Sequence, residues 1–210
     1  MMTLTAIWRY PIKSMRGEPL QAVALSEEGV FGDRTVQVFN RRRLVTARTH
    51  PALLSHQGAL GEDGEPTVDG HAWTSPEARA IITAVVGEGA EFRRDAGHRF
   101  DVLPLLVATD GALAAFGRDT RRLRPNLVIG GVPGLQERDW EGRRLRIGDA
   151  VIWLDDLRAR CVMTTFDPDT VAQDPEVLRD IVRRFEGTLC LNASVVTPAR
   201  VAVGDPVDLL

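Results

Sequence analysis

Cysteine and histidine are scarce in this chain of 210 residues. The two cysteines, Cys161 and Cys190, are too few for the disulfide framework of a small secreted protein. They form no CxxC pair, and no group of cysteines and histidines has the spacing of a zinc site. The four histidines are scattered along the chain, and no HExxH motif is present.

Long apolar runs and an excess of one charge are also missing. No run approaches the ~18 apolar residues that indicate a membrane-spanning helix. Arg9 and Lys13 lie where a signal peptide would need its apolar core. The net charge of -3 gives no global reason to expect a nucleic acid or an anionic membrane surface as a partner. We therefore expect a cytoplasmic protein with no nucleic-acid partner and no membrane partner.

Lysine is the scarcest charged residue, because Lys13 is the only lysine among the 26 basic residues. Coding bias alone explains such a ratio in general. A lysine retained against that bias nevertheless indicates a position where a compact ammonium suits better than a planar guanidinium.

Strands outnumber helices in the pattern of apolar residues. Strands are expected over 3–9, 35–39, 44–47, 105–108 and 126–129. Helices are expected after Ser75-Pro76, after Thr109-Asp110 and after Asp174-Pro175, ending at Gly87, Gly117 and Gly187. Two Gly-Asp turns, within 146–151 and 202–207, have hairpin chemistry and indicate a barrel or a tightly curled sheet. The predicted fold class is α+β, dominated by strands.

Four polar or cationic segments lie at the edges of predicted strands, where sites are usually built. They are residues 10–17, 29–34, 122–126 and 160–169. Taken alone, each has an ordinary interpretation as a solvated turn, a surface ion pair, a cationic face or, for Cys161, a buried inert cysteine.

Together, these segments supply the groups that a phosphorylated, metal-bearing cofactor needs. Cations and hydrogen-bond donors suited to a phosphate are Lys13, Ser14, Arg34, Arg124 and Asn126. The helix start at Thr109 could add backbone N–H groups, although the Asp110 carboxylate would oppose an anion. Arg160 lies beside Cys161 and favours its thiolate, the form that binds a soft or intermediate metal. Nucleotide motifs are absent, and no histidine that could serve Ser-His-Asp hydrolysis lies in these segments.

At these residues the sequence resembles the MOSC family, named for the C-terminal domain of molybdenum cofactor sulfurase. It is most similar to the branch with an N-terminal β-barrel domain, which includes the mitochondrial amidoxime-reducing component and its bacterial relatives. The matching segments are Tyr10-Pro-Ile-Lys-Ser14 with Arg16-Gly17, Gly29-Val-Phe-Gly-Asp-Arg34, Thr46-Ala-Arg48 with Pro51, Arg124-Pro-Asn126, Arg160-Cys161 with Thr164-Thr-Phe-Asp-Pro168, and Gly204-Asp205. The resemblance implies an N-terminal β-barrel-like domain over 1–70 and a MOSC domain over 71–210.

The resemblance also implies roles for the candidate residues. Cys161 would be the catalytic thiolate ligand of molybdenum. Lys13, Ser14, Arg34, Arg124 and Asn126 would bind the pterin and its phosphate. Pyridoxal phosphate is not expected, because a Schiff base needs a lysine and the resemblance assigns Lys13 to the phosphate.

The function implied is that of a molybdenum-cofactor-dependent oxidoreductase. It would reduce N-hydroxylated or related small-molecule substrates, with electrons from a separate ferredoxin- or cytochrome-type protein and its reductase. Two alternatives stay open: a non-catalytic carrier of the cofactor, and a sulfur-transfer protein that uses Cys161 as a persulfide. Val171 stands where the family usually has glycine, and the usual proline before Arg160-Cys161 is missing, so the local loop shape is expected to differ.

Overall fold

A closed barrel of seven strands forms the larger part of the computed structural model, which describes residues 1–94 and 99–210. Around the barrel the order is β12-β11-β15-β14-β13-β17-β1, and pairing of β1 with β12 closes it. All neighbours are antiparallel except β11 and β12. The strands are β1 (Met2–Arg9), β11 (Leu105–Thr109), β12 (Leu127–Gly130), β13 (Arg144–Ile147), β14 (Ala150–Ala159), β15 (Thr188–Thr197) and β17 (Pro206–Leu209).

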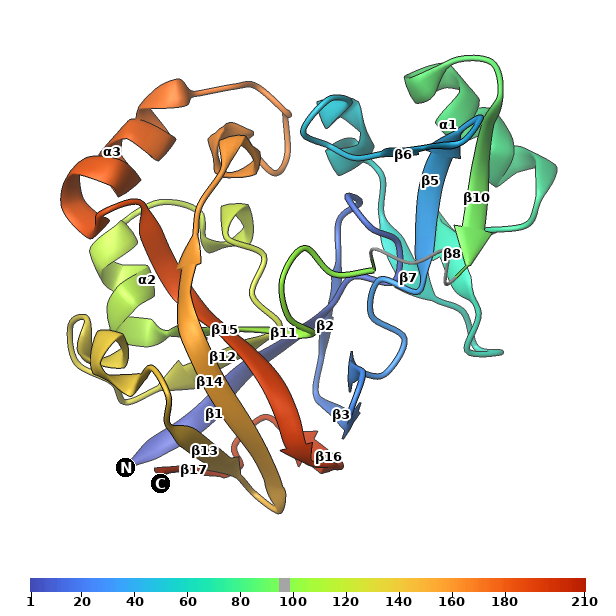
Figure 1. The fold of residues 1–210 in the computed structure, drawn as a ribbon. Coiled ribbons are helices and arrows are strands. Elements are labelled where there is room, and N and C mark those ends of the chain that lie inside the picture. The colour runs from blue at the N-terminus through green and yellow to red at the C-terminus, as the bar shows by residue number, and fades with distance from the viewer. Residues whose placement is uncertain (95–98) are drawn as a thin grey trace.

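Smaller sheets and short helices complete the molecule (Figure 1). The sheet β10-β5-β6 lies beside α1, away from the barrel, whereas α2 and α3 lie against the barrel. The remaining elements are β2 (Glu18–Leu20), β3 (Ala22–Ser26), β4 (Gly29–Val30), β5 (Val36–Asn40), β6 (Arg43–Val45), β7 (Gly58–Leu60), β8 (Pro66–Val68), β9 (His71–Ala72), β10 (Ala90–Arg94), β16 (Ala199–Ala202), α1 (Pro76–Val86), α2 (Asp110–Phe116), α3 (Pro175–Phe185), η1 (Pro51–Ser55), η2 (Thr120–Arg122), η3 (Gln136–Trp140) and η4 (Val162–Thr165).

Local capping chemistry explains where the three α-helices begin. The Ser75 hydroxyl accepts a hydrogen bond from the Ala78 amide, and Asp174 accepts one from Glu176, so each caps its helix ahead of a proline. Thr109 caps α2 in the same way. The predicted starts and the strand-dominated α+β class are therefore confirmed.

The second Gly-Asp turn does not form a hairpin, so that prediction is wrong. The first turn joins β13 to β14 as expected. At the second, β16 pairs with β3 while β17 pairs with β1 and β13, so the chain changes sheet at Gly204-Asp205. A turn sequence fixes only the local bend, whereas the partner of each strand depends on distant residues. Of the four scattered histidines, His98 lies outside the described residues.

Three clusters of buried residues form the core. One fills the barrel with residues such as Leu4, Leu127 and Ile152. Another lies under α2 and α3, and a third lies in the N-terminal half among β5, β6 and α1. Phe166, from the C-terminal half, is 7% exposed and belongs to the N-terminal cluster, with Met163 packed against that cluster. The segment after Cys161 therefore fastens the two halves together.

This fastening can be tested on Phe166. We expect Phe166→Ala to lower the free energy of unfolding by about 3 kcal/mol, because it removes a buried aromatic ring from the contact between the halves. Urea denaturation would measure the change. Phe31→Ala is the matched control, because Phe31 is 60% exposed and its loss should cost less than about 0.5 kcal/mol. Equal costs for the two variants would contradict the packing described.

Candidate functional site

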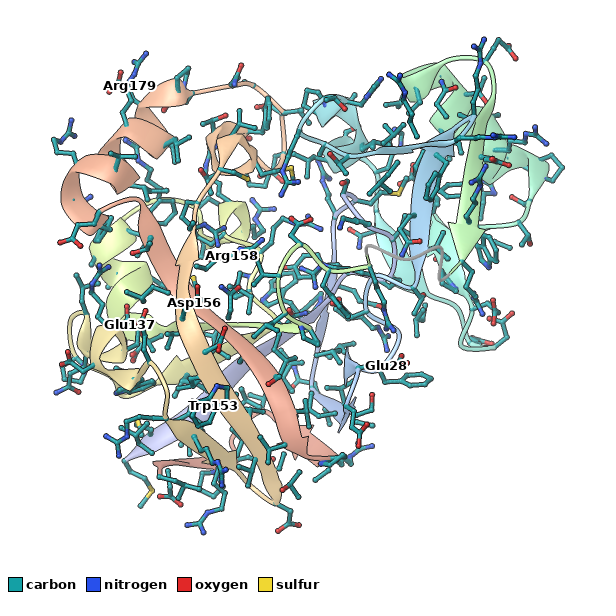
Figure 2. The ribbon with its side chains drawn as sticks, viewed as in Figure 1. Glu28, Glu137, Trp153, Asp156, Arg158 and Arg179 are labelled. Atoms are coloured by element: carbon teal, nitrogen blue, oxygen red, sulfur yellow. The ribbon has the colours of Figure 1, made fainter. Side chains whose placement is uncertain are left out.

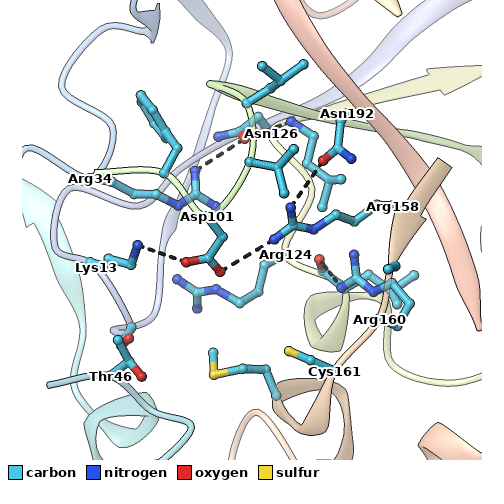
Figure 3. Close-up of a pocket in the computed structure, with 18 of the residues that line it drawn as sticks. Lys13, Arg34, Thr46, Asp101, Arg124, Asn126, Arg158, Arg160, Cys161 and Asn192 are labelled. Atoms are coloured by element: carbon cyan, nitrogen blue, oxygen red, sulfur yellow. Dashed lines mark hydrogen bonds and ion pairs between the residues drawn. The ribbon is translucent and has the colours of Figure 1, made fainter. Parts of the chain in front are cut away.

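Seven of the eight candidate residues converge on one cavity. Loops from both halves of the chain meet there at the end of β14 (Figure 3). The candidates that line it are Lys13, Ser14, Arg34, Arg124, Asn126, Arg160 and Cys161.

Pairing of β1 with β12 brings two of the predicted segments together, residues 10–17 and residues 122–126. The Trp8 amide donates to the Asn126 carbonyl at 2.8 Å, and the Asn126 Nδ2 donates to the Trp8 carbonyl at 3.2 Å. The Tyr10 hydroxyl donates to the Pro125 carbonyl at 3.1 Å. The loop after β1, which carries Lys13, is thereby held against the loop before β12, which carries Arg124.

The turn at 29–34 supplies the next cation. Gly32 has a φ of +77°, a conformation that favours glycine, and it lets the chain turn before Asp33. The buried Asp33 carboxylate accepts from the Tyr10 amide at 2.6 Å and forms an ion pair with Arg34. Arg34 Nη1 then donates to the Asn126 Oδ1 at 3.3 Å. Asn126 thus positions Arg34 and its own loop through hydrogen bonds inside the protein.

Strained backbone also marks the cavity. Ser14, Arg34 and Arg124 have φ values of 74°, 51° and 56°, in the left-handed region that residues other than glycine seldom adopt. Such conformations persist only where the surrounding structure fixes them, and they cluster at functional sites.

Arg124 and Ser14 retain hydrogen-bonding capacity. The Arg124 guanidinium lies over the Tyr10 ring, 4.2 Å from its centroid. Burial lowers the pKa of Arg124 to about 10, which leaves it charged at neutral pH. Within residues 1–94 and 99–210, neither the Arg124 guanidinium nor the Ser14 hydroxyl makes a hydrogen bond, so both can serve a ligand.

Arg160 has an unsatisfied buried donor. Its Nη2 donates to the Leu123 carbonyl at 2.7 Å, but its Nε is buried without a hydrogen-bond partner in the described structure. Burial lowers the pKa of Arg160, and both Cys190 and Cys161 lie close enough to oppose this shift. An unpartnered buried N–H beside a partly exposed Cys161 fits a cavity that accepts an acceptor-rich ligand.

Asp101 is an acidic residue of this cavity that the sequence patterns did not single out. Its carboxylate lies 2.9 Å from Lys13 Nζ, 2.6 Å from Arg48 Nη2 and 3.4 Å from Arg158 Nη2. Burial would raise the pKa of Asp101, but the hydrogen bond from Lys13 and the charges of Lys13, Arg48 and Arg158 outweigh it and hold the pKa below 3.8. Asp101 is therefore the carboxylate that balances the cations on one side of the cavity (Figure 3).

Arg48 is a further cation of this cavity. Burial would lower the pKa of Arg48, but the nearby Cys161 side chain and the Asp101 carboxylate, to which Arg48 donates a hydrogen bond, outweigh that effect and raise it. Arg48 lies in the Thr46-Ala-Arg48 segment, which the sequence comparison singled out without assigning it to the site. Arg158 and Asn192 were missed, and their side chains are joined by a hydrogen bond of 3.3 Å.

Thr109 is the candidate that the structure does not bring to the cavity. Its fully buried hydroxyl donates to Glu137 Oε2 at 3.1 Å and accepts from the Ala112 amide as the cap of α2. The neighbouring Asp110 carboxylate already accepts from the amides of Gly131 and Val132, so the helix start offers no vacant anion site. Thr109 is left out of the proposed site for this reason.

Metal binding at the cavity would need ligands besides those of the chain. Among the described residues, no three His, Cys, Asp or Glu side chains lie close enough together to hold a metal ion. A metal on Cys161 would therefore depend on a bound group for most of its coordination. That requirement, together with the cations around the cavity, fits an anionic cofactor that brings its own ligands.

Comparison with known proteins identifies the family. The MOSC domain matches residues 111–208, and the MOSC N-terminal beta barrel domain matches residues 1–92. The human mitochondrial amidoxime-reducing component 1 is 25% identical over an alignment covering 99% of this chain and 83% of that protein. The human mitochondrial amidoxime reducing component 2 is 30% identical over 91 residues, which cover 40% of this chain and 27% of that protein.

Solved structures agree on the fold. The YuaD protein of Bacillus subtilis superposes with a TM-score of 0.52 and 14% identity, over 100% of this chain and 96% of that structure. The chain belongs to the MOSC family, with the N-terminal beta barrel domain preceding the MOSC domain. Family membership connects it with the molybdenum cofactor. In the part of the chain that is described, no helix is long and apolar enough to cross a bilayer.

Protonation of Asp101 gives a testable pH dependence. Because its folded-state pKa lies below 3.8, Asp101 stabilises the native state above that pH, and the contribution is lost as the pH falls through the folded-state pKa. We expect Asp101→Asn to unfold at lower urea concentration than the wild type at pH 6, with a difference that shrinks progressively below pH 3.8. Urea denaturation at several pH values would measure it. A difference as large at pH 2.5 as at pH 6 would contradict the ion-pair assignment.

Proposed function

We propose that this protein binds a molybdenum cofactor and reduces N-hydroxylated or related N-oxygenated substrates with electrons from a separate carrier protein. The observation that supports this most is the convergence of Cys161 with Lys13, Ser14, Arg34 and Arg124 around one cavity. The human relatives are amidoxime-reducing components, and this activity suggests the substrate class.

Each residue has a role in this proposal that its contacts support. Cys161 would supply the one protein thiolate to the metal, and the cation Arg48 lines the same cavity. Arg124, Ser14, Lys13 and the unpartnered Nε of Arg160 would hold the anionic part of the cofactor. When bound, the cofactor supplies the two-electron oxygen-transfer chemistry. The cavity volume of about 100 Å³ is below the roughly 300–1,000 Å³ typical of ligand pockets, so binding of the cofactor would require lining side chains to rearrange.

Metal content and turnover test the proposal directly. We expect protein made in a cofactor-competent host to carry molybdenum and pterin, and to reduce an amidoxime with an artificial electron donor. Cys161→Ser should fold and lose molybdenum or activity. Cys190→Ser is the matched control, because Cys190 is fully buried, its burial raises its pKa to about 11, and it does not line this cavity.

The outcomes separate the alternatives. Protein that contains molybdenum but does not reduce the amidoxime would indicate a non-catalytic carrier of the cofactor. A persulfide on Cys161 without molybdenum would indicate sulfur transfer. Equal loss of metal in both cysteine variants would contradict the ligand assignment.

Lys13 tests the anion-binding part of the site. We expect Lys13→Ala to weaken cofactor retention about 10- to 150-fold, the cost of one charge-assisted hydrogen bond. Lys13→Arg should have a smaller but measurable effect, because a planar fork needs more room than an ammonium. Molybdenum content after dilution and dialysis would measure both. Arg43→Ala is the control, because Arg43 is exposed on β6, and it should leave the molybdenum content unchanged. Full retention of molybdenum by Lys13→Ala would exclude Lys13 from the site.

A further inference from the structure

A second cavity of about 250 Å³ adjoins the first and differs from it in chemistry. It lies where the end of β1 and η1 face the loops around η2 and η4, and it shares Arg122, Arg124 and Met163 with the first cavity. Its aromatic and apolar lining residues include Trp8, Tyr10, Leu54, Phe166 and Pro168. Cys161 does not line it, so it lies next to the proposed metal position.

Two arginines of the second cavity, Arg121 and Arg122, are already paired with carboxylates of the protein. Arg121 lies 2.6 Å from both Asp119 and Asp169, so its charge is paired on two sides. Arg122 lies 2.9 Å from Asp167 and also donates to the Thr165 carbonyl at 3.1 Å.

Arg16, which like Arg121 lines the second cavity and not the first, directs two of its donors to backbone carbonyls. Its Nε donates to the Leu54 carbonyl and its Nη2 to the Asp169 carbonyl, both at 3.0 Å. A guanidinium also offers a flat face for stacking. Arg121 and Arg122 therefore have little charge left for an anion, whereas Arg124, in the wall shared by the two cavities, keeps a guanidinium without a hydrogen bond in the described structure.

Two polar atoms of the lining residues retain hydrogen-bonding capacity. Gln57 commits both Nε2 hydrogens, to the carbonyls of Gly17 and Gly58 at 2.9 Å, which fixes its amide and leaves Oε1 as an acceptor. Over residues 1–94 and 99–210, Gln57 Oε1 accepts no hydrogen bond and Trp8 Nε1 donates none. Away from the shared wall, the cavity thus combines aromatic side chains with the acceptor Gln57 Oε1 and the donor Trp8 Nε1.

We propose that this second cavity binds the uncharged planar ring of the substrate, which carries a hydrogen-bond donor and an acceptor on its edge. This inference rests on the proposed function, because it places the substrate beside the cofactor. Apolar and aromatic walls with a few fixed polar groups are typical of small-molecule sites. The shared wall of Arg124 and Met163 is where a reactive group attached to the ring would reach the first cavity.

Three matched probes test the chemistry of the ring site. Benzamide is planar and uncharged, with a donor and an acceptor; benzoate keeps the shape but is an anion; cyclohexanecarboxamide keeps the amide but is not planar. Ligand-observed NMR titration of the molybdenum-loaded protein would give the three dissociation constants. We expect benzamide to bind at least fivefold more tightly than either analogue. Equal binding of the three, or a preference for benzoate, would overturn the proposal.

A matched pair of tryptophan variants locates the binding. Trp8→Phe keeps an aromatic wall but removes the Nε1 donor, and it should weaken benzamide about three- to tenfold, the cost of one neutral hydrogen bond. Trp153→Phe makes the same change on β14, away from Arg158 and both cavities, and should leave benzamide binding unchanged (Figure 2). Equal effects of the two variants would place the ring elsewhere and overturn the proposal.

Cofactor loading separates this proposal from the proposed function. Molybdenum is measured on every sample, and apo-protein is titrated in parallel. Benzamide binding in apo-protein that disappears on loading would mean that the cofactor occupies the second cavity, which overturns the substrate assignment. Benzamide binding that persists in loaded protein supports it. Protein that takes up no molybdenum would contradict the proposed function, and the substrate assignment would fall with it.

Discussion

Closure of the barrel by β1 is the constraint on which the site depends. This strand comes from the first residues of the chain, yet it pairs with β12 and β17, more than a hundred residues away. The reciprocal hydrogen bonds between Trp8 and Asn126 continue that pairing past the last barrel position. Without it, the loop that carries Lys13 would have no fixed relation to Arg124 or to the cysteine after β14. The cavity is therefore a product of tertiary pairing.

The cations that line the two cavities differ in how far carboxylates of the protein neutralise them. In the first cavity, the Asp101 carboxylate forms ion pairs with Lys13, Arg48 and Arg158. The Arg124 guanidinium instead lies over the Tyr10 ring. In the adjoining cavity, carboxylates pair with Arg121 and Arg122, and Arg16 donates to two backbone carbonyls. A buried charge without a partner is costly, so an Arg124 left in that condition indicates where an anion is expected. Arg124 lies in the wall that the two cavities share, so an anion is expected at that wall.

The sequence could predict what local chemistry determines. Ser75-Pro76 and Asp174-Pro175 specify helix starts through their own side chains and backbone, and those starts are where they were expected. Local chemistry also led to the incorrect placement of Thr109 in the site. Thr109 caps α2, and a capping sequence is the same whether or not the helix start binds an anion. Asp101 carried no local signal, because its role depends on three cations brought together by tertiary pairing. Motif membership singled out Arg48, but nothing in the motif indicated its ion pair with Asp101.

The departure at Val171 shows how far a tertiary context can override a local preference. The family usually has glycine there, and Val171 keeps a φ of 60°, which a β-branched residue seldom adopts. Its amide donates to the Asp167 carbonyl at 2.9 Å, and Asp167 also pairs with Arg122. The loop is thus held in the conformation that glycine would allow, although its sequence disfavours it. Because Asp167 neutralises Arg122, this strained loop keeps an arginine of the shared wall from acting as an anion site, and so helps to keep the two cavities chemically distinct.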